Sequence, residues 1–265
     1  MTSLAEKEQQ LRELLRSLPK ALIAYSGGVD SAYLLWVAHQ ELGSRVLGIL
    51  ADSPSLKRQE LADSQLFAQT WQLPLRVIAT RELENPAYQA NPLNRCFHCK
   101  HELFDQMQRI ALLEAYPALC YGENADDAGE LRPGQKAAQE FRVLAPLREA
   151  GLSKADIRAL ARAAGLSVAD KTAQPCLSSR IPHGLEVTPE KLQQIEKAEA
   201  VLEQEGFRIF RVRHHGERAL VLVSPEETPQ LLKPDTIRRI AISIQSCGFQ
   251  QVDFDPLGYR GASLR

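Results

Sequence analysis

The stretch Ser26-Gly27-Gly28-Val29-Asp30-Ser31 decides the fold of this chain. It follows an apolar run over residues 21–25 and precedes an apolar-rich stretch over 32–38, so the pattern predicts a strand, a glycine-rich loop and a helix. Glycines let the backbone approach an anion closely, and the first N–H groups of a helix attract negative charge. The pattern therefore predicts a phosphate-binding loop, with an ordinary glycine-rich βα turn as the alternative.

This loop differs from the Walker A loop, which needs a lysine to reach the β- and γ-phosphates of a nucleotide. No lysine lies between Lys20 and Lys57. A Ser-Gly-Gly-x-Asp-Ser loop, with an aspartate in place of that lysine, resembles the PP-loop of the ATP pyrophosphatase superfamily. The resemblance implies cleavage of ATP to AMP and pyrophosphate, usually by adenylation of a carboxylate or carbonyl oxygen.

Composition and charge narrow the class of protein. The 265 residues are 44% hydrophobic and 25% charged, which suits one large globular domain or two smaller ones. The formal net charge of −1, without a long basic run, argues against a nucleic-acid partner. No apolar run reaches the roughly 18 residues of a membrane span, and the amphipathic segment over 3–17 lacks the apolar core of a signal peptide. We therefore expect a cytoplasmic protein without a membrane partner, whose five cysteines are not structural disulfides.

The first half of the chain alternates apolar and amphipathic segments. Strands are expected at 20–25, 45–51, 75–79 and 118–122, and helices near 3–17, 30–42, 56–71 and 100–114. This alternation predicts a doubly wound parallel α/β sheet that is covered on both faces. Ligands of such sheets bind at the carboxyl ends of the strands, so the loops after these strands should share one rim.

The second half has a different rhythm. It predicts a helix over 153–164, an irregular stretch over 169–187, a helix over 189–205, strands over 207–214 and 219–223, a helix over 234–246 and a strand over 249–254. The pattern is typical of a smaller α+β domain. We therefore expect a PP-loop domain over 1–168 and a C-terminal domain over 169–265 that includes the loop around Cys176.

Two rim segments carry candidate nucleotide and metal ligands. Asp52 and Ser53 follow the second expected strand, where doubly wound folds place the base and ribose of a nucleotide, although a solvated turn is the alternative. Asp126 and Asp127 follow the fourth expected strand. They are candidates for Mg²⁺, which prefers one or two carboxylates plus phosphate oxygens, and an acidic helix cap is the alternative.

Three cysteines carry a different chemistry. The run Arg95-Cys96-Phe97-His98-Cys99-Lys100 brings two thiols to the start of a helix. Four interpretations of these thiols remain open, namely a redox dithiol, a zinc site, an iron–sulfur cluster and two unliganded thiols. A zinc ion would lack further ligands at this spacing, and a cluster would need a third cysteine from elsewhere in the chain. Cys176 lies in a polar loop near Lys171 and Arg180, whose positive charges favour the thiolate form. This favours a functional, nucleophilic Cys176, with an incidental loop thiol as the alternative.

The other two cysteines and one strand complete the set of candidates. Cys120 and Cys247 lie in apolar segments and are expected to be packed. Arg211 and Arg213 alternate onto one face of an expected strand. Two guanidinium groups on one face suit a substrate phosphate, with a solvated strand face as the alternative.

Six segments together resemble the LarE family of ATP-dependent sulfur transferases. These are SGGVDS, RCFHCK, GENADD, RPGQKA, PCLSSRIPHG and RVRHHG. The resemblance runs from about Leu11 to beyond Val223. It implies a hexamer that takes part in the synthesis of the nickel-pincer nucleotide cofactor. Family members adenylate a carboxylate of pyridinium-3,5-biscarboxylic acid mononucleotide with MgATP, release pyrophosphate and form a thiocarboxylate.

The family uses two sulfur chemistries. In one, the cysteine that matches Cys176 gives up its own sulfur and becomes dehydroalanine. In the other, three cysteines hold a [4Fe–4S] cluster whose open iron carries the sulfide donor. The presence of Cys96, Cys99 and Cys176 favours the cluster type.

The resemblance also implies roles for individual residues. The residues expected to bind ATP phosphates are Ser26, Gly27, Gly28, Asp30 and Ser31. Arg211 and Arg213 match the arginines that hold the substrate phosphate, with Glu199 a weaker candidate beside them. Asp30 and Cys176 are the expected catalytic residues, and Arg180 is an expected cofactor-binding residue. The strand over 219–223 lacks the acid that family members tend to show there.

Three rival functions remain. A tRNA thiolase would also use a PP-loop and a cluster, but the near-neutral charge argues against it. An ammonia-using PP-loop ligase would leave the cysteines idle. A zinc- or nucleotide-binding regulator would release no pyrophosphate.

Overall fold

The computed structural model describes residues 2–127, 132–172 and 174–259. The chain divides into two compact units. The first comprises residues 1–82 and 94–174, and the second comprises 83–93 and 175–265. The sequence pattern predicts a single boundary between residues 168 and 169. In the structure the short segment 83–93 also belongs to the second unit, and the chain re-enters the first unit at residue 94.

The first unit is built on a four-stranded parallel sheet with the strand order β3-β2-β1-β4. The strands are β1 (Ala21–Tyr25), β2 (Val46–Asp52), β3 (Leu75–Ala79) and β4 (Ala118–Tyr121). Every residue of β1 is buried, as expected for a central strand covered on both faces. The sheet confirms the predicted doubly wound α/β class.

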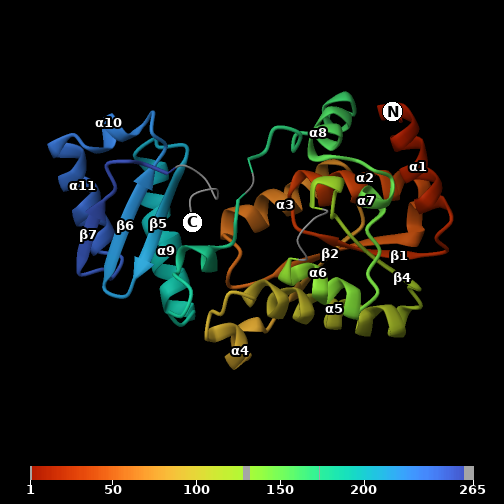
Figure 1. Cartoon of the computed structure of the whole chain (residues 1–265), viewed down its shortest axis with the longest axis horizontal. Helices are drawn as coiled ribbons and strands as arrows, with labels where there is room; N and C mark the ends of the chain where they lie inside the picture. The colour runs from red at the N-terminus through yellow and green to blue at the C-terminus, as the bar shows by residue number, and fades with distance from the viewer. Residues whose placement is uncertain (1, 128–131, 173, 260–265) are drawn as a thin grey trace. The chain divides into compact units, whose positions relative to one another are not determined.

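Helices cover both faces of this sheet (Figure 1). They are α1 (Leu4–Arg16), α2 (Val29–Leu42), α3 (Arg58–Thr70), α5 (Arg95–Glu114), α6 (Pro133–Glu140), α7 (Pro146–Glu149) and α8 (Lys154–Ala163). Helix α5 begins earlier than the expected 100, so the CxxC run lies in its first two turns. The pattern predicts neither α6 nor α7, which each begin with a proline at the first helical position.

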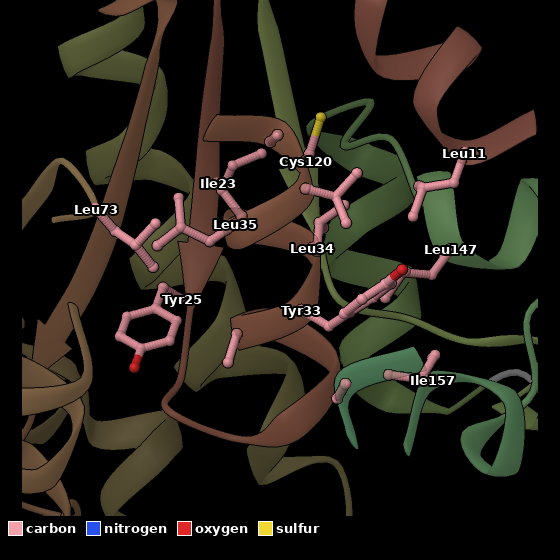
Figure 2. Close-up of a cluster of buried hydrophobic side chains, with 14 of the residues drawn as sticks. Leu11, Ile23, Tyr25, Tyr33, Leu34, Leu35, Leu73, Cys120, Leu147 and Ile157 are labelled. Atoms are coloured by element: carbon pink, nitrogen blue, oxygen red, sulfur yellow. The ribbon is translucent and has the colours of Figure 1, made fainter. Parts of the chain in front are cut away.

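Helix α2, which begins at the glycine-rich loop, lies in the main core of the first unit. Figure 2 shows Tyr33, Leu34 and Leu35 of α2 among side chains from other elements, including Ile157 of α8 and Leu147 of α7. A helix that is buried on most of its circumference has little freedom to shift. The core therefore fixes the N-terminus of α2 against the end of β1.

The second unit contains a three-stranded mixed sheet with α9 (Pro189–Gln204) and α11 (Pro234–Gln245) packed on it (Figure 1). The strands are β5 (Phe210–His215), β6 (Arg218–Val223) and β7 (Gln251–Phe254), and the short helices are α4 (Pro86–Gln89) and α10 (Thr228–Leu231). Strand β5 is antiparallel to β6, and β6 is parallel to β7. This small separate sheet confirms the predicted α+β character.

None of the helices within the described ranges combines the length and the hydropathy that a membrane crossing would require.

Candidate active site

The glycine-rich loop has the backbone geometry of an anion site. Gly27 has φ +74°, and a Cβ added there would lie 1.9 Å from Oγ of Ser64, so only glycine fits. Gly28 is the N-cap of α2 and makes no side-chain cap hydrogen bond. The first N–H groups of α2 therefore face the loop without a side-chain cap at that residue, which suits a phosphate.

Two serines close the loop on itself. The backbone N–H of Ser26 donates to Oγ of Ser31 at 3.1 Å, and that hydroxyl donates to the carbonyl of Gly28 at 3.1 Å. The end of β4 lies against the same turn, because a Cβ on Gly122 would be 2.8 Å from the backbone nitrogen of Ser31. The carboxyl ends of β1 and β4 therefore meet at this loop, as the rim argument predicts.

Asp30 connects the loop to a cation that the sequence pattern misses. Nζ of Lys154 lies 2.5 Å from Oδ2 of Asp30, and Nδ2 of Asn124 lies 3.5 Å from the same oxygen. Oδ1 of Asp30 is buried and has no hydrogen-bond partner among the described residues. A lysine absent from the loop itself is thus supplied by the first residue of α8.

The two aspartates after β4 are already engaged. Oδ2 of Asp126 accepts the backbone N–H of Lys154 at 2.8 Å, and Oδ1 of Asp127 pairs with Arg132 at 2.6 Å. Within the described ranges, no group of three or more His, Cys, Asp or Glu side chains is arranged to hold a metal ion. Mg²⁺ in nucleotide sites needs only one or two carboxylates, and the unpartnered Oδ1 of Asp30 is a suitable oxygen donor.

The rim after β2 contains a buried carboxyl group. Asp52 pairs with Arg58 at 2.5 Å, while the buried Ser53 donates to Oε1 of Glu82 and accepts the backbone N–H of Ser55 at 3.0 Å. Glu82 is buried, and its Oε2 has no partner among the described residues. No pattern in the sequence singles out Glu82, because its burial depends on contacts with the β2 rim.

The first unit carries two of the three candidate cysteines. Cys96 is exposed and Cys99 is half-exposed, and both are reduced thiols on one face of α5. Lys100, next in the chain, lies with Nζ 4.8 Å from the centre of the Tyr121 ring. Burial lowers the pKa of Lys100, although the neighbouring Cys99 acts in the opposite direction. Two thiols and a cation thus lie close together at the start of α5.

The other cysteines divide as expected between packed and exposed thiols. Cys120 is fully buried in the core, where burial raises its pKa to about 12. Cys247 is half-buried, and burial raises its pKa as well. Cys176, in the second unit, is exposed and reduced. A thiol that is to act as a ligand or a nucleophile must be accessible, so Cys176 meets that requirement and Cys120 does not.

The arginine strand of the second unit presents its two guanidinium groups on the face opposite its buried Val212. Arg213 is exposed, whereas Arg211 is half-buried and lies 5.0 Å from the centre of the Tyr259 ring. Burial, and then the charge of Arg180, lower the pKa of Arg211. The strand therefore offers one exposed and one partly desolvated arginine.

Arg180, which the sequence predicts as a cofactor-binding residue, is fully buried. Its Nε and Nη2 donate to the two carboxylate oxygens of Glu199 at 2.8 Å and 3.0 Å. Both side chains are thus committed to each other inside the second unit. The sequence pattern weighs Arg180 and Glu199 separately and gives no sign of this pairing.

Comparisons with known proteins identify the family. An uncharacterized protein of Synechocystis is 41% identical over 261 residues, which cover 98% of this chain and 97% of that protein. Pyridinium-3,5-bisthiocarboxylic acid mononucleotide synthase of Lactiplantibacillus plantarum is 29% identical over 268 residues, 100% of this chain and 95% of that synthase. The chain belongs to the LarE family. No protein-family profile matches it.

A more distant similarity supports the LarE-family fold. A polypeptide of the glutamine-hydrolysing GMP synthase from Methanopyrus kandleri is 27% identical over 214 residues, 75% of this chain and 68% of that polypeptide. This LarE-family chain shares its PP-loop fold with that synthase. Membership in the family also supports the prediction of an enzyme of the ATP-dependent sulfur transferase class.

Proposed function

We propose that this chain is an ATP-dependent sulfur transferase that converts a carboxylate of pyridinium-3,5-biscarboxylic acid mononucleotide into a thiocarboxylate. The observation that carries the proposal is the contact of Asp30 with Lys154 beside the glycine-rich loop. It puts a cation, a carboxylate and the N-terminus of a helix at one point, which suits a triphosphate. The similarity to a synthase named for a bisthiocarboxylic acid mononucleotide supports the substrate class.

The first half-reaction activates the carboxylate. A carboxylate oxygen of the substrate attacks the α-phosphorus of ATP, the bond from that phosphorus to pyrophosphate breaks, and an acyl-adenylate forms. The loop over 26–31 binds the phosphates through its N–H groups, and Lys154 neutralises the charge of the leaving pyrophosphate. Oδ1 of Asp30 would hold Mg²⁺, with Asp126 and Asp127 as further candidate ligands. Asp52 and Ser53 lie at the rim expected for the adenosine.

The second unit binds the phosphate of the substrate. Arg211 and Arg213 point from one face of β5, and a pair of guanidinium groups binds the oxygens of a phosphate in a fixed orientation. The partial burial of Arg211 strengthens such a contact, because water competes less there. We assign residues 169–265 the roles of substrate binding and of assembly into a cytoplasmic hexamer, as the family resemblance implies.

The second half-reaction delivers sulfur. Cys96, Cys99 and Cys176 are reduced thiols, and three thiolates suit a [4Fe–4S] cluster that keeps one iron open. Such a cluster, when bound, would supply hydrosulfide at the open iron. Cys96, Cys99 and Cys176 would hold this group, and the sulfur nucleophile that it supplies would replace AMP on the acyl-adenylate. In the chain, Cys96 follows closely on Leu93, the last residue of the segment that groups with the unit of Cys176.

Anaerobic reconstitution with iron and sulfide, followed by turnover and intact-protein mass measurement, tests this function. We expect pyrophosphate release that depends on the dicarboxylate mononucleotide, a cluster spectrum that Cys176→Ala abolishes, and an unchanged protein mass. Dehydroalanine at position 176 without bound iron would refute the cluster mechanism and show instead that Cys176 gives up its own sulfur. The absence of pyrophosphate release with this acceptor would refute the proposed substrate, and thiolation of copurified tRNA would point to a tRNA thiolase.

A further inference from the structure

The backbone of Cys176 is held firmly although its thiol is exposed. The carbonyl oxygen of Cys176 accepts hydrogen bonds from the N–H of Ser179 at 2.9 Å, the hydroxyl of Ser179 at 2.7 Å and Nη1 of Arg180 at 3.0 Å. Nη1 of Arg180 also donates to the carbonyl of Pro175. One buried guanidinium therefore binds the two consecutive carbonyls that fix the direction of the Cys176 side chain.

The same guanidinium is connected to the arginine strand. Oε1 of Glu199, which accepts from Nε of Arg180, also accepts the backbone N–H of Val212 at 3.2 Å. Val212 lies between Arg211 and Arg213 on β5. Two buried side chains thus connect the carbonyl of Cys176 to the backbone of the strand that carries the candidate phosphate ligands.

The pair is better explained by geometry than by stability. A buried ion pair is often no more stabilising than apolar residues of the same volume, because both charges lose their hydration. Here the planar guanidinium uses Nε and Nη2 for the carboxylate and Nη1 for the carbonyls, an arrangement that lysine cannot reproduce. Such a pair fixes a distance and an orientation, which an apolar contact would leave loose.

The downstream side of the Cys176 loop has separate supports. The hydroxyls of Tyr88 and Ser178 share a buried hydrogen bond of 2.7 Å. Nδ2 of Asn91 donates to the carbonyls of Ile181 and Pro182 at 3.2 Å and 2.8 Å. Loss of Arg180 should therefore loosen the backbone at 175–176 and leave the rest of the loop in place.

We propose that Arg180 and Glu199 are positioning residues that hold Cys176 in register with Arg211 and Arg213. A substrate gripped by its phosphate then presents its activated carboxylate to the sulfur delivered at Cys176. This inference rests on the proposed sulfur transfer. It predicts that the pair affects the transfer of sulfur and leaves carboxylate activation, which depends on the loop over 26–31, nearly untouched.

The variants Arg180→Lys and Glu199→Gln test the proposal, and Arg239→Lys is the matched control. Arg239 forms a 2.8 Å ion pair with Glu205 in the same unit, but that pair is partly exposed and connects α11 to the C-cap of α9. Glu199→Gln keeps one oxygen that can accept from the N–H of Val212, but it removes the charge and replaces the second acceptor of the Arg180 pair with a donor, so it provides a second test if Arg180→Lys folds poorly.

The first measurement uses the protein without cofactor or substrate. We expect amide hydrogen exchange over 176–179 to rise roughly tenfold in both test variants, because local openings become more frequent, while exchange in β6 is unchanged. The control should match the wild type throughout. Exchange over 176–179 that equals the wild type would overturn the proposal, as would exchange that rises equally across the whole second unit.

The second measurement separates the two half-reactions. Thiocarboxylate formation should fall roughly 10- to 100-fold, since small misplacements of a reacting group have effects of that size, while pyrophosphate release stays within about twofold of wild type. An equal loss of both products would show a general structural role and overturn the proposal. If the wild type itself released no pyrophosphate, the proposed function would fail, and hydrogen exchange would still decide whether the pair holds Cys176.

Discussion

The phosphate loop over 26–31 and the loop around Cys176 are both fixed in place, but by different means. The phosphate loop is shaped by its own residues, through the positive φ of Gly27 and the hydrogen bonds of Ser26 with Ser31. The Cys176 loop is held by partners from elsewhere in the chain, among them Glu199 and Asn91. The first arrangement depends on local conformation, and the second depends on tertiary structure.

The largest effect should come from the local conformation. Gly27→Ala places a methyl group 1.9 Å from Oγ of Ser64 at a φ of +74°. We expect ATP-dependent pyrophosphate release to fall more than about 100-fold, because a misplaced loop loses the oriented N–H groups on which the phosphates depend. A steady-state pyrophosphate assay measures this.

Gly28→Ala is the matched control for that variant. A Cβ at Gly28 meets only Oγ of Ser26 at 3.5 Å, an ordinary contact, and its φ of −79° suits any residue. Pyrophosphate release should therefore fall much less than in Gly27→Ala. Equal losses in the two variants would show that the special backbone of Gly27 is not what shapes the site.

The same contrast explains how much can be predicted from sequence. Short sequence patterns predict the strands of the first unit, the loop over 26–31 and the start of α2, and the structure confirms these predictions. The expected range for α5 begins five residues late, although the CxxC run is expected at the start of a helix, because the residues of that run are only moderate helix formers. Local rules thus describe local structure well.

Pairs that depend on the tertiary fold are not predictable in this way. Lys154 lies 124 positions from Asp30, and only the packing of α8 against α2 brings them together. Arg180 and Glu199 are 19 positions apart, and their mutual burial turns a predicted ligand into an internal support. Single-residue chemistry suggests what Arg180 could bind, but only the fold decides which partner it has.

The second prediction concerns the long-range cation of the phosphate site. Lys154→Met should lower pyrophosphate release roughly 100-fold, because the charge that develops on the leaving group loses its cationic partner. Lys7→Met is the control, since Lys7 pairs at 2.7 Å with Asp156 on the same helix α8. A loss in Lys7→Met as large as that in Lys154→Met would mean that α8 is merely destabilised.

A third, smaller effect is expected at the substrate arginines. Arg211→Lys keeps the charge but loses the planar pair of donors, so the KM for the mononucleotide should rise roughly 10-fold while the KM for ATP is unchanged. Arg208 is an exposed arginine just before β5, and Arg208→Lys should change neither the KM for the mononucleotide nor the KM for ATP. A rise in the KM for ATP alone would instead assign Arg211 to the nucleotide.

The smallest effect concerns the packed side of the arginine strand. Burial lowers the pKa of His214 to about 4, and its Nε2 lies 2.8 Å from Oε1 of Gln194. The unfolded chain then binds a proton at a higher pH than the folded chain does, so stability is lost as the pH falls from the ordinary value near 6.5 toward 4. The loss should be at most about 1.4 kcal/mol per pH unit.

Urea unfolding at pH 7 and pH 5 measures this term. His214→Gln should unfold with a smaller difference between the two pH values than the wild type, because the buried imidazole is gone. If His214→Gln retained the wild-type difference, the acid sensitivity would have to come from groups other than His214, and the packed face of β5 would tolerate a charge beneath its arginines.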